Sequence, residues 1–186
     1  MAFMLETERL FIRPFKDSDL DSVLAYRNDP EVARYQGWDI PYPREKAIKW
    51  VTNPDVIVPT EPGERFKAAL ELKATQEMIG DLGFMLSEDD PRQAHFGYSL
   101  TQAHWHKGYA TEACNQLLTF LFDERNLHRV KAETDVLNEK SWRLLERLGF
   151  RREAYFVENF WFKGAYASEY HYAMLKREWD ERKTPL

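Results

Sequence analysis

The sequence predicts a single mixed α/β domain, and three of its features support this prediction. The chain has 186 residues, which suits one domain, and its 12 Phe, 9 Tyr and 6 Trp are enough to fill a core. Between residues 66 and 100, three segments with strand character are joined by short links, which predicts an antiparallel meander. From residue 94 to residue 136 the order is strand, loop, long helix and strand, which predicts parallel strands joined by a crossover helix.

The N-terminal segment predicts one strand and one helix. Residues 5–13 have strand character, and Pro14 stops this first strand. Ser18, with Asp21 three residues later, can cap the helix that follows. Asn28-Asp29-Pro30 then breaks the helix, because proline cannot continue it.

A second helix and a loop precede the meander. Residues 35–42 are aromatic, polar and proline-bearing, and ordinary packing explains them without a functional role. The helix starts near Pro43, because proline is well suited to the first helical position. Three further prolines mark the loop after it: Pro54, Pro59 and Pro62.

The meander consists of residues 66–72, 78–86 and a third strand that ends at Leu100. Gly80 and Gly83 lie inside the second strand, where glycine indicates a bulge or a close approach of another backbone.

The loop Trp105–Thr111 is a candidate anion site. It opens a helix whose apolar residues share one face: Ala110, Ala113, Cys114, Leu117, Leu118 and Leu121. Unpaired backbone N–H groups and the positive end of the helix dipole meet at such a start, and Gly108 lets the backbone approach an anion closely. Many helices simply begin after a glycine loop, so the residues of the loop alone leave an ordinary helix start equally open.

The C-terminal third predicts a strand, a helix and a hairpin. Residues 128–136 alternate as a strand, and Asn138 begins a shorter helix that Gly149 ends as a C-cap. Residues 155–162 and 167–175 then pair as a β-hairpin.

Composition excludes several classes of function. The net charge of −5 provides no basic surface for nucleic acid and mildly favours cationic partners. The apolar runs are too short for a membrane span, and the first residues lack an export signal, so we expect a cytoplasmic location. The single cysteine, Cys114, lies on an apolar helix face and is expected to be buried. The five histidines form no metal-ligand pair on a common helix, so no metal site is expected.

Two motifs together resemble the GNAT N-acetyltransferases. The loop Trp105-His106-Lys107-Gly108-Tyr109-Ala110 resembles their pyrophosphate loop, with His106 in place of the first glycine of one branch, which acetylates the N-terminal alanine or serine of ribosomal proteins. Asn138-x-x-Ser141 before a leucine-rich helix and Gly-Phe resembles their second motif, although helix capping alone also explains Asn and Ser there. Thr7-Glu8-Arg9-Leu10 is similar to the start of the same branch.

The resemblance implies one GNAT domain over residues 1–186, with about seven strands in a splayed mixed sheet and about four helices. It implies acetyl-CoA as co-substrate and no metal. The residues it assigns to acetyl-CoA are Leu100, Thr101, His106, Lys107, Gly108, Tyr109, Ala110, Thr111, Asn138 and Ser141.

For the chemistry, the resemblance implies direct attack of an amine on the thioester in a ternary complex. Backbone near Leu100 and Thr101 would polarise the carbonyl, and Ser141 would protonate the thiolate or serve only as a cap. Several relatives use a tyrosine at the position of Leu145 as the proton donor. Because this chain has leucine there, a tyrosine donor at that position is excluded. Glu158 aligns with a glutamate proposed as base, or it is an ordinary solvated carboxylate.

The acceptor remains open at the level of sequence. The branch that the chain resembles implies a protein N-terminal α-amine, with a ribosomal protein as partner, and it places residues 35–42 at the wall of the acceptor cleft. A polyamine, an aminoglycoside or an amino acid is the alternative, and a non-catalytic module that binds acyl-CoA is a third. The assembly is expected to be a monomer or a homodimer, without direct contact to nucleic acid or membrane.

Overall fold

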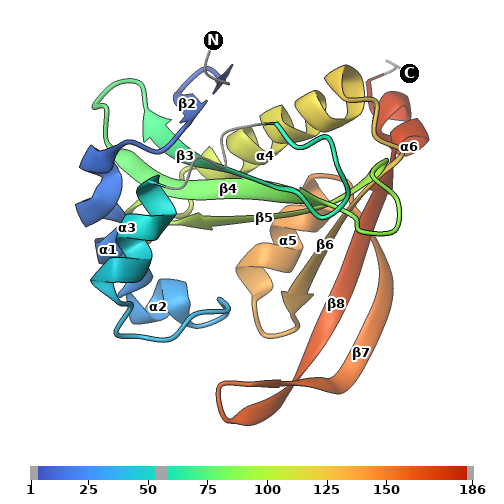
Figure 1. Ribbon diagram of the computed structural model, residues 1–186. Helices are drawn as coiled ribbons and strands as arrows, with labels where there is room; N and C mark the ends of the chain where they lie inside the picture. The colour runs from blue at the N-terminus through green and yellow to red at the C-terminus, as the bar shows by residue number, and fades with distance from the viewer. Residues whose placement is uncertain (1–3, 53–57, 184–186) are drawn as a thin grey trace.

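The computed structural model describes residues 4–52 and 58–183 as one open sheet with helices on both faces (Figure 1). Pro54 and the first three residues, which the sequence assigned to a loop and to the start of the chain, lie outside the described residues. The eight strands follow the order β1-β2-β3-β4-β5-β6-β8-β7, in which β5 and β6 are parallel neighbours and the other pairs are antiparallel. The mixed α/β prediction is confirmed.

The first predicted strand is two strands in the structure. β1 (Leu5–Glu6) and β2 (Leu10–Arg13) pair antiparallel with each other, so the expected single strand over 5–13 is wrong. Thr7 causes the reversal, because its backbone N–H donates to Leu10 O at 3.0 Å and its hydroxyl accepts from Leu10 N at 2.9 Å.

The helices of the N-terminal half pack on one face of the sheet. They are the 3-10 turn η1 (Asp17–Asp19), α1 (Leu20–Arg27), α2 (Pro30–Ala33) and α3 (Arg44–Thr52). Their core meets the sheet at Ala69 of β3 and Met78 of β4. Ser18 lies within η1 and is not the helix cap, contrary to expectation; Lys16 precedes the turn, and its N–H donates to Asp19 Oδ2 at 2.8 Å.

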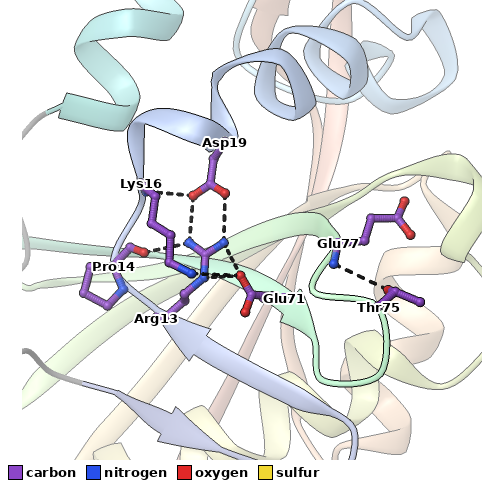
Figure 2. A network of polar contacts seen from close by, with 7 residues as sticks. All are labelled: Arg13, Pro14, Lys16, Asp19, Glu71, Thr75 and Glu77. Atoms are coloured by element: carbon purple, nitrogen blue, oxygen red, sulfur yellow. Dashed lines mark hydrogen bonds and ion pairs between the residues drawn. The ribbon is translucent and has the colours of Figure 1, made fainter.

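An arginine ties this helical layer to the sheet (Figure 2). Arg13 of β2 donates to both oxygens of Asp19, at 2.7 and 2.8 Å, and its Nε donates to Glu71 of β3 at 2.6 Å. All three side chains are buried, and Lys16 Nζ adds a contact to Glu71 at 3.2 Å. Removing one member of such a buried group leaves an uncompensated charge, which typically costs about 3–5 kcal/mol.

The antiparallel meander is confirmed as β3 (Arg65–Leu72), β4 (Met78–Leu86) and β5 (Gln93–Leu100). Both interpretations of the β4 glycines hold. The expected bulge is the shift in the β3–β4 register between Leu70 and Glu71, opposite the start of β4. A Cβ on Gly80 would lie 2.1 Å from Ser99 O, so the neighbouring backbone excludes any larger side chain.

The parallel pair is short and then opens. β5 and β6 (Arg129–Asp135) are paired only from Gln93/Arg129 to His95/Lys131, and both strands continue beyond that point. The crossover between them is α4 (Tyr109–Thr119), extended by one wider π-helical turn, η3 (Phe120–Glu124), and it covers the face opposite α1. Cys114 of α4 is fully buried, as expected, and burial raises its pKa to about 12.

The C-terminal third closes the sheet. α5 (Glu139–Arg147) is followed by β7 (Arg151–Phe162), β8 (Ala165–Leu175) and α6 (Lys176–Glu181), a helix that the sequence did not predict. β8 inserts between β6 and β7, and the β7–β8 hairpin projects beyond the rest of the sheet (Figure 1). Within residues 4–52 and 58–183, no helix is long and apolar enough to cross a bilayer.

Candidate active site

A groove of about 860 Å³ runs along the loop before α4 and the start of α5. Most of the residues that the sequence assigned to acetyl-CoA line it: Leu100, His106, Gly108, Tyr109, Ala110, Thr111, Asn138 and Ser141. Segments far apart in the chain therefore meet there, because the end of β5, the start of α4 and the start of α5 lie at the same edge of the opened sheet.

The loop has the backbone shape of an anion cradle. Gly108 has a φ of 84° and directly precedes the first residue of α4, Tyr109. His106 adopts a φ of 61°, so the histidine takes the left-handed conformation that a glycine would favour at that position. The N–H groups of the first helical turn have no intrahelical partner, and an anion there gains about 0.3–1 kcal/mol from the dipole.

The end of β5 is hydrogen-bonded to the loop before α4. Trp105 Nε1 donates to Leu100 O at 2.9 Å, and Thr101 N donates to Ile79 O at 2.8 Å. Hydrogen bonds alternate in direction along an antiparallel strand, so the Leu100 N–H points away from β4 and toward the opened side of the sheet. Of the two residues predicted to present a backbone donor, Leu100 is therefore the one with its N–H directed at the groove.

A clamp from the N-terminus holds the other side of the loop. Glu112 in the first turn of α4 accepts from Thr7 Oγ1 and Arg9 N through Oε1, at 2.5 and 2.8 Å, and from Arg9 Nε through Oε2 at 2.6 Å. Arg9 also donates to Lys107 O at 3.0 Å and lies 4.4 Å from the centre of the Tyr109 ring. In the sequence, Thr7-Glu8-Arg9-Leu10 was only a point of resemblance. In the structure, this segment holds the loop before α4 in place.

The charge of the groove suits an anionic ligand. Four cationic side chains line it: Arg34, Lys140, Arg143 and Arg147. Two histidines, His104 and His106, add further donors, and the acidic lining is limited to Glu31 and Glu139. In a chain with a net charge of −5, this local excess of positive charge is a property of the site.

A second, smaller cavity of about 220 Å³ occupies the opening between β5 and β6. It shares Tyr35, Gln36, Tyr98, Asn138 and Ser141 with the groove, so the two spaces meet at these five residues. Side chains from both faces of the sheet line it, since successive residues such as Ala132 and Glu133 point to opposite faces.

Tyr98 and Ser141 form the polar contact where the two cavities meet. Burial raises the pKa of Tyr98 and outweighs the nearby Ser141 side chain, which acts to lower it, so the Tyr98 hydroxyl stays protonated. Asn138 Oδ1 accepts from Ser141 N at 3.3 Å, so the capping interpretation of the Asn-x-x-Ser motif holds for this oxygen. Leu145 also lines the smaller cavity. A tyrosine does reach this cavity, but it is Tyr98 of β5, which the sequence analysis missed.

The smaller cavity is acidic. Glu133, Asp135 and Glu169 line it, and no lysine or arginine does. Glu169 Oε1 lies 2.8 Å from His171 Nε2, and Glu133 Oε1 lies 3.0 Å from His95 Nε2. Contact with His95 is the largest cause that lowers the pKa of Glu133, so this carboxylate is ionised.

The same group has the donor set of a metal site. Potential ligand atoms of Glu133, Glu169 and His171 lie within 4.8 Å of one another. The sequence analysis missed this group because β6 and β8 are adjacent only in the fold.

Three predicted site residues line neither cavity. The Thr101 hydroxyl contacts His104 Nδ1 at 2.8 Å, and Lys107 contributes its carbonyl to the clamp. Glu158 is exposed in the irregular part of β7, where its N–H donates to Ser168 Oγ at 2.8 Å. The structure therefore does not bring Glu158 together with Ser141 in one cavity.

Of the aromatic residues proposed for an acceptor wall, Tyr35 lines both cavities. Trp38 instead stacks on the buried Arg27, with 4.2 Å between the guanidinium carbon and the ring centre. Trp161, an aromatic residue of β7 outside the segment 35–42, is 65% exposed and packs edge-on against Tyr166.

Comparison with known proteins identifies relatives over the whole chain. A family model described as "Acetyltransferase (GNAT) domain" matches residues 9–151. The Uncharacterized N-acetyltransferase p20 of Bacillus licheniformis is 31% identical over 179 residues, which cover 94% of this chain and 97% of that protein. A crystal structure of a GNAT-family acetyltransferase from Bacillus anthracis has a TM-score of 0.81 at 28% identity and covers 94% of this chain and 99% of its own.

Two further solved structures share the fold but differ in the acceptor they are named for. One is a ribosomal-protein-S5-alanine acetyltransferase from Vibrio fischeri, with a TM-score of 0.76, 22% identity and coverage of 95% and 98% of the two chains. The other is a spermidine N-acetyltransferase from Vibrio cholerae in complex with CoA and spermine, with a TM-score of 0.76, 23% identity and coverage of 91% and 97%. At this level of identity the likeness concerns the fold alone.

Proposed function

Because the chain belongs to the GNAT acetyltransferase family, we propose that it transfers the acetyl group of acetyl-CoA to the α-amino group of a protein N-terminus. The N-acetyltransferase reaction and its co-substrate follow from the family. The acceptor is our inference, and its support comes from the two cavities.

The main support for the proposal is that the two cavities have opposite charges. The groove with Arg34, Lys140, Arg143 and Arg147 suits the phosphates of CoA, which also find the N–H groups of the α4 start. The smaller cavity with Glu133, Asp135 and Glu169 suits an ammonium group. The two spaces meet at Tyr98 and Ser141, so an acetyl group at the end of CoA and an amine would meet there.

The residues at this junction have the roles that thioester aminolysis needs. The Leu100 N–H is directed at the opened side of the sheet and can donate to the thioester oxygen as negative charge develops. Ser141, which lines both cavities beside the protonated Tyr98, can supply a proton to the leaving thiolate. No covalent intermediate is required, because the amine attacks the thioester directly.

The size and the proton chemistry of the acceptor site favour an α-amine. A cavity of about 220 Å³ accommodates an amine with a short first side chain. An α-amine with a pKa of about 7.7–8.0 is roughly one-tenth neutral at pH 7, whereas a lysine with a pKa of about 10.4 is neutral in only ~0.04% of molecules. The difference of about 2.5 pKa units corresponds to roughly 3.4 kcal/mol that a lysine acetylase must supply in addition.

A small polyamine is the second candidate, and the acidic lining favours it. Three carboxylates around one small space would also attract a ligand with several positive charges. The two candidates differ in what extends beyond the reacting amine: a peptide continues as a neutral backbone, and a polyamine continues as further ammonium groups.

An acceptor panel tests the proposal. The purified protein is incubated with acetyl-CoA and peptides that begin with alanine or serine, peptides with a blocked N-terminus and an internal lysine, spermidine, an aminoglycoside or free amino acids. We expect CoA thiol release with the free N-terminal peptides, and mass spectrometry should place the acetyl group on the α-amine. Acetylation of internal lysines with untouched N-termini, or turnover of small amines alone, would contradict the proposed acceptor.

A further inference from the structure

Glu169 of β8 occupies the position of an acceptor-side base. It lines the smaller cavity together with Tyr98 and Ser141, the residues at the junction with the CoA groove. Its side chain is 18% exposed, so it is shielded from bulk water and still open to the cavity.

Two neighbours hold the Glu169 carboxylate by one oxygen. Asn159 Nδ2 donates to Oε1 at 2.8 Å from β7, and His171 Nε2 lies 2.8 Å from the same oxygen on β8. Within the described parts of the chain, no hydrogen bond or ion pair engages Oε2. The arrangement orients the carboxylate and leaves one oxygen for a ligand.

The groups that face Glu169 make its surroundings negative. Asp135 of β6 is its register partner, and Glu133 follows on the same strand face. His171 of β8 lies between the two glutamates, with Nδ1 3.8 Å from Glu133 Oε1. His95 of β5 and Lys131 of β6 reach Glu133 from the other side, and the β7 neighbour Asn159 is uncharged. An ammonium ion is therefore attracted to this point.

We propose that Glu169 is the base that receives the acceptor amine and removes its proton. This inference rests on amine acetylation as the reaction, but it does not depend on which amine is the acceptor. It replaces Glu158 in that role, because Glu158 is exposed and lines neither cavity.

The reaction balances with this assignment. The ammonium gives one proton to Glu169, and the neutral nitrogen forms a C–N bond to the thioester carbon. The C–S bond breaks, and its electron pair goes to sulfur. The nitrogen then loses its second proton, which replaces the proton that the Ser141 hydroxyl gives to the thiolate. The products are an amide, the CoA thiol and one proton, which Glu169 releases to solvent.

Glu169→Gln tests the assignment, because glutamine keeps the shape and can still accept from Asn159 and His171. At pH 7 we expect kcat/KM to fall about tenfold for an α-amine acceptor, because only about one-tenth of that amine is neutral without the base, and to fall further for an amine of higher pKa. CoA affinity from calorimetry and the thermal midpoint should be unchanged. Glu181→Gln, at an exposed carboxylate of α6, removes the same charge elsewhere and should keep wild-type activity.

The pH profile distinguishes a base from a structural residue. Without the base, kcat/KM of Glu169→Gln should rise about tenfold per pH unit until the amine itself deprotonates, near 7.7–8.0 for an α-amine. The wild-type protein should reach its plateau at lower pH, so the deficit should narrow in alkaline buffer. A pH-independent deficit would contradict the role of base.

Two other results would also overturn the assignment. One is a Glu169→Gln protein as active as wild type while Glu158→Gln is impaired. The other is wild-type activity that is lost on treatment with EDTA and restored by a divalent cation, which would make the Glu133, Glu169 and His171 group a metal site. If the wild-type protein acetylates no amine at all, the proposed function fails, and this outcome is distinct from a failure of Glu169.

Discussion

Gly108 and His106 have similar left-handed backbone angles but differ in how replaceable they are. A Cβ on Gly108 would lie 3.2 Å from the Arg9 guanidinium, in a backbone conformation that costs a non-glycine residue about 1 kcal/mol or more. His106 shows that the loop tolerates a side chain at one left-handed position. The restriction at Gly108 therefore combines backbone angle with a close neighbour.

We predict that Gly108→Asp weakens CoA binding at least tenfold. It adds a side chain against Arg9 and a negative charge beside the N–H groups expected to bind the pyrophosphate. Calorimetry on the folded variant measures the effect. Gly37→Asp is the matched control, because a Cβ there meets no atom within 4 Å. An unchanged affinity in a cooperatively folding Gly108→Asp protein would refute the placement of the pyrophosphate.

Ser141 and Tyr98 should act as one unit. We predict that Ser141→Ala lowers kcat while changing the KM for acetyl-CoA little, because a group that protonates the thiolate acts mainly in the transition state. Tyr98→Phe should lower kcat in the same way, since it removes the hydroxyl that lies beside Ser141 where the two cavities meet. Combining the two substitutions should cost less than the sum of the single effects. Full kcat in the stable Ser141→Ala variant would reduce Ser141 to part of the α5 cap.

At the scale of elements, the N-terminal turn and α4 are one functional assembly. Burial acts to raise the pKa of Glu112, but hydrogen bonds from Thr7 and Arg9 outweigh it and lower this pKa below its ordinary value of 4.5. A carboxylate with a lowered pKa stabilises the fold above about pH 4.5, and this contribution is lost as the pH falls through the lowered value.

We predict that Glu112→Gln raises the KM for acetyl-CoA about fivefold, the equivalent of ~1 kcal/mol, because the loop loses its charged anchor. The variant should also lose less stability than wild type between neutral pH and pH 4, measured by thermal unfolding. Glu124→Gln, an exposed carboxylate at the end of η3, should change neither value. If both variants behave alike, the clamp does not position the loop.

Sequence periodicity predicted the long elements and missed the short ones. The helix over α4 and the meander of β3, β4 and β5 follow from side-chain patterns that local rules capture. The turn at Thr7, the four-residue α2 and the six-residue α6 are too short for such patterns, and local hydrogen bonds define their starts.

The candidate site divides in the same way. The residues of the CoA groove lie in contiguous sequence motifs, so the sequence alone could predict them. Their roles in binding CoA stay predictions. Tyr98 and Glu169 reach the site from separate strands, so only strand order could bring them into view.

At the scale of the molecule, the opening between β5 and β6 organises the charge. The two strands pair over only three residues, and beyond them the sheet is open to both faces. Positive side chains gather along the groove and carboxylates gather in the smaller cavity, although the chain as a whole is only moderately acidic. Two substrates of opposite charge can therefore enter without competing for one surface.

The smaller cavity is closed by parts of the chain that are far apart in sequence. Tyr35 and Gln36 follow α2, and Phe160, Phe162 and Glu169 belong to the β7–β8 hairpin. Lys163 in the hairpin turn joins the two, because its Nζ donates to the carbonyl of Ala33 at the end of α2 at 2.6 Å. This contact spans 130 residues of sequence and joins the two walls.

We predict that Lys163→Met raises the KM for the acceptor about fivefold and leaves acetyl-CoA binding unchanged. Methionine keeps the length of the side chain but cannot donate, and a lost hydrogen bond of ~1 kcal/mol corresponds to this factor. Steady-state kinetics with each substrate varied in turn separate the two effects. Lys46→Met, at an exposed lysine of α3, removes the same charge away from the cavity and should leave both KM values as in wild type. Equal KM values for the acceptor in Lys163→Met and wild type would mean that the walls hold their spacing without this bond.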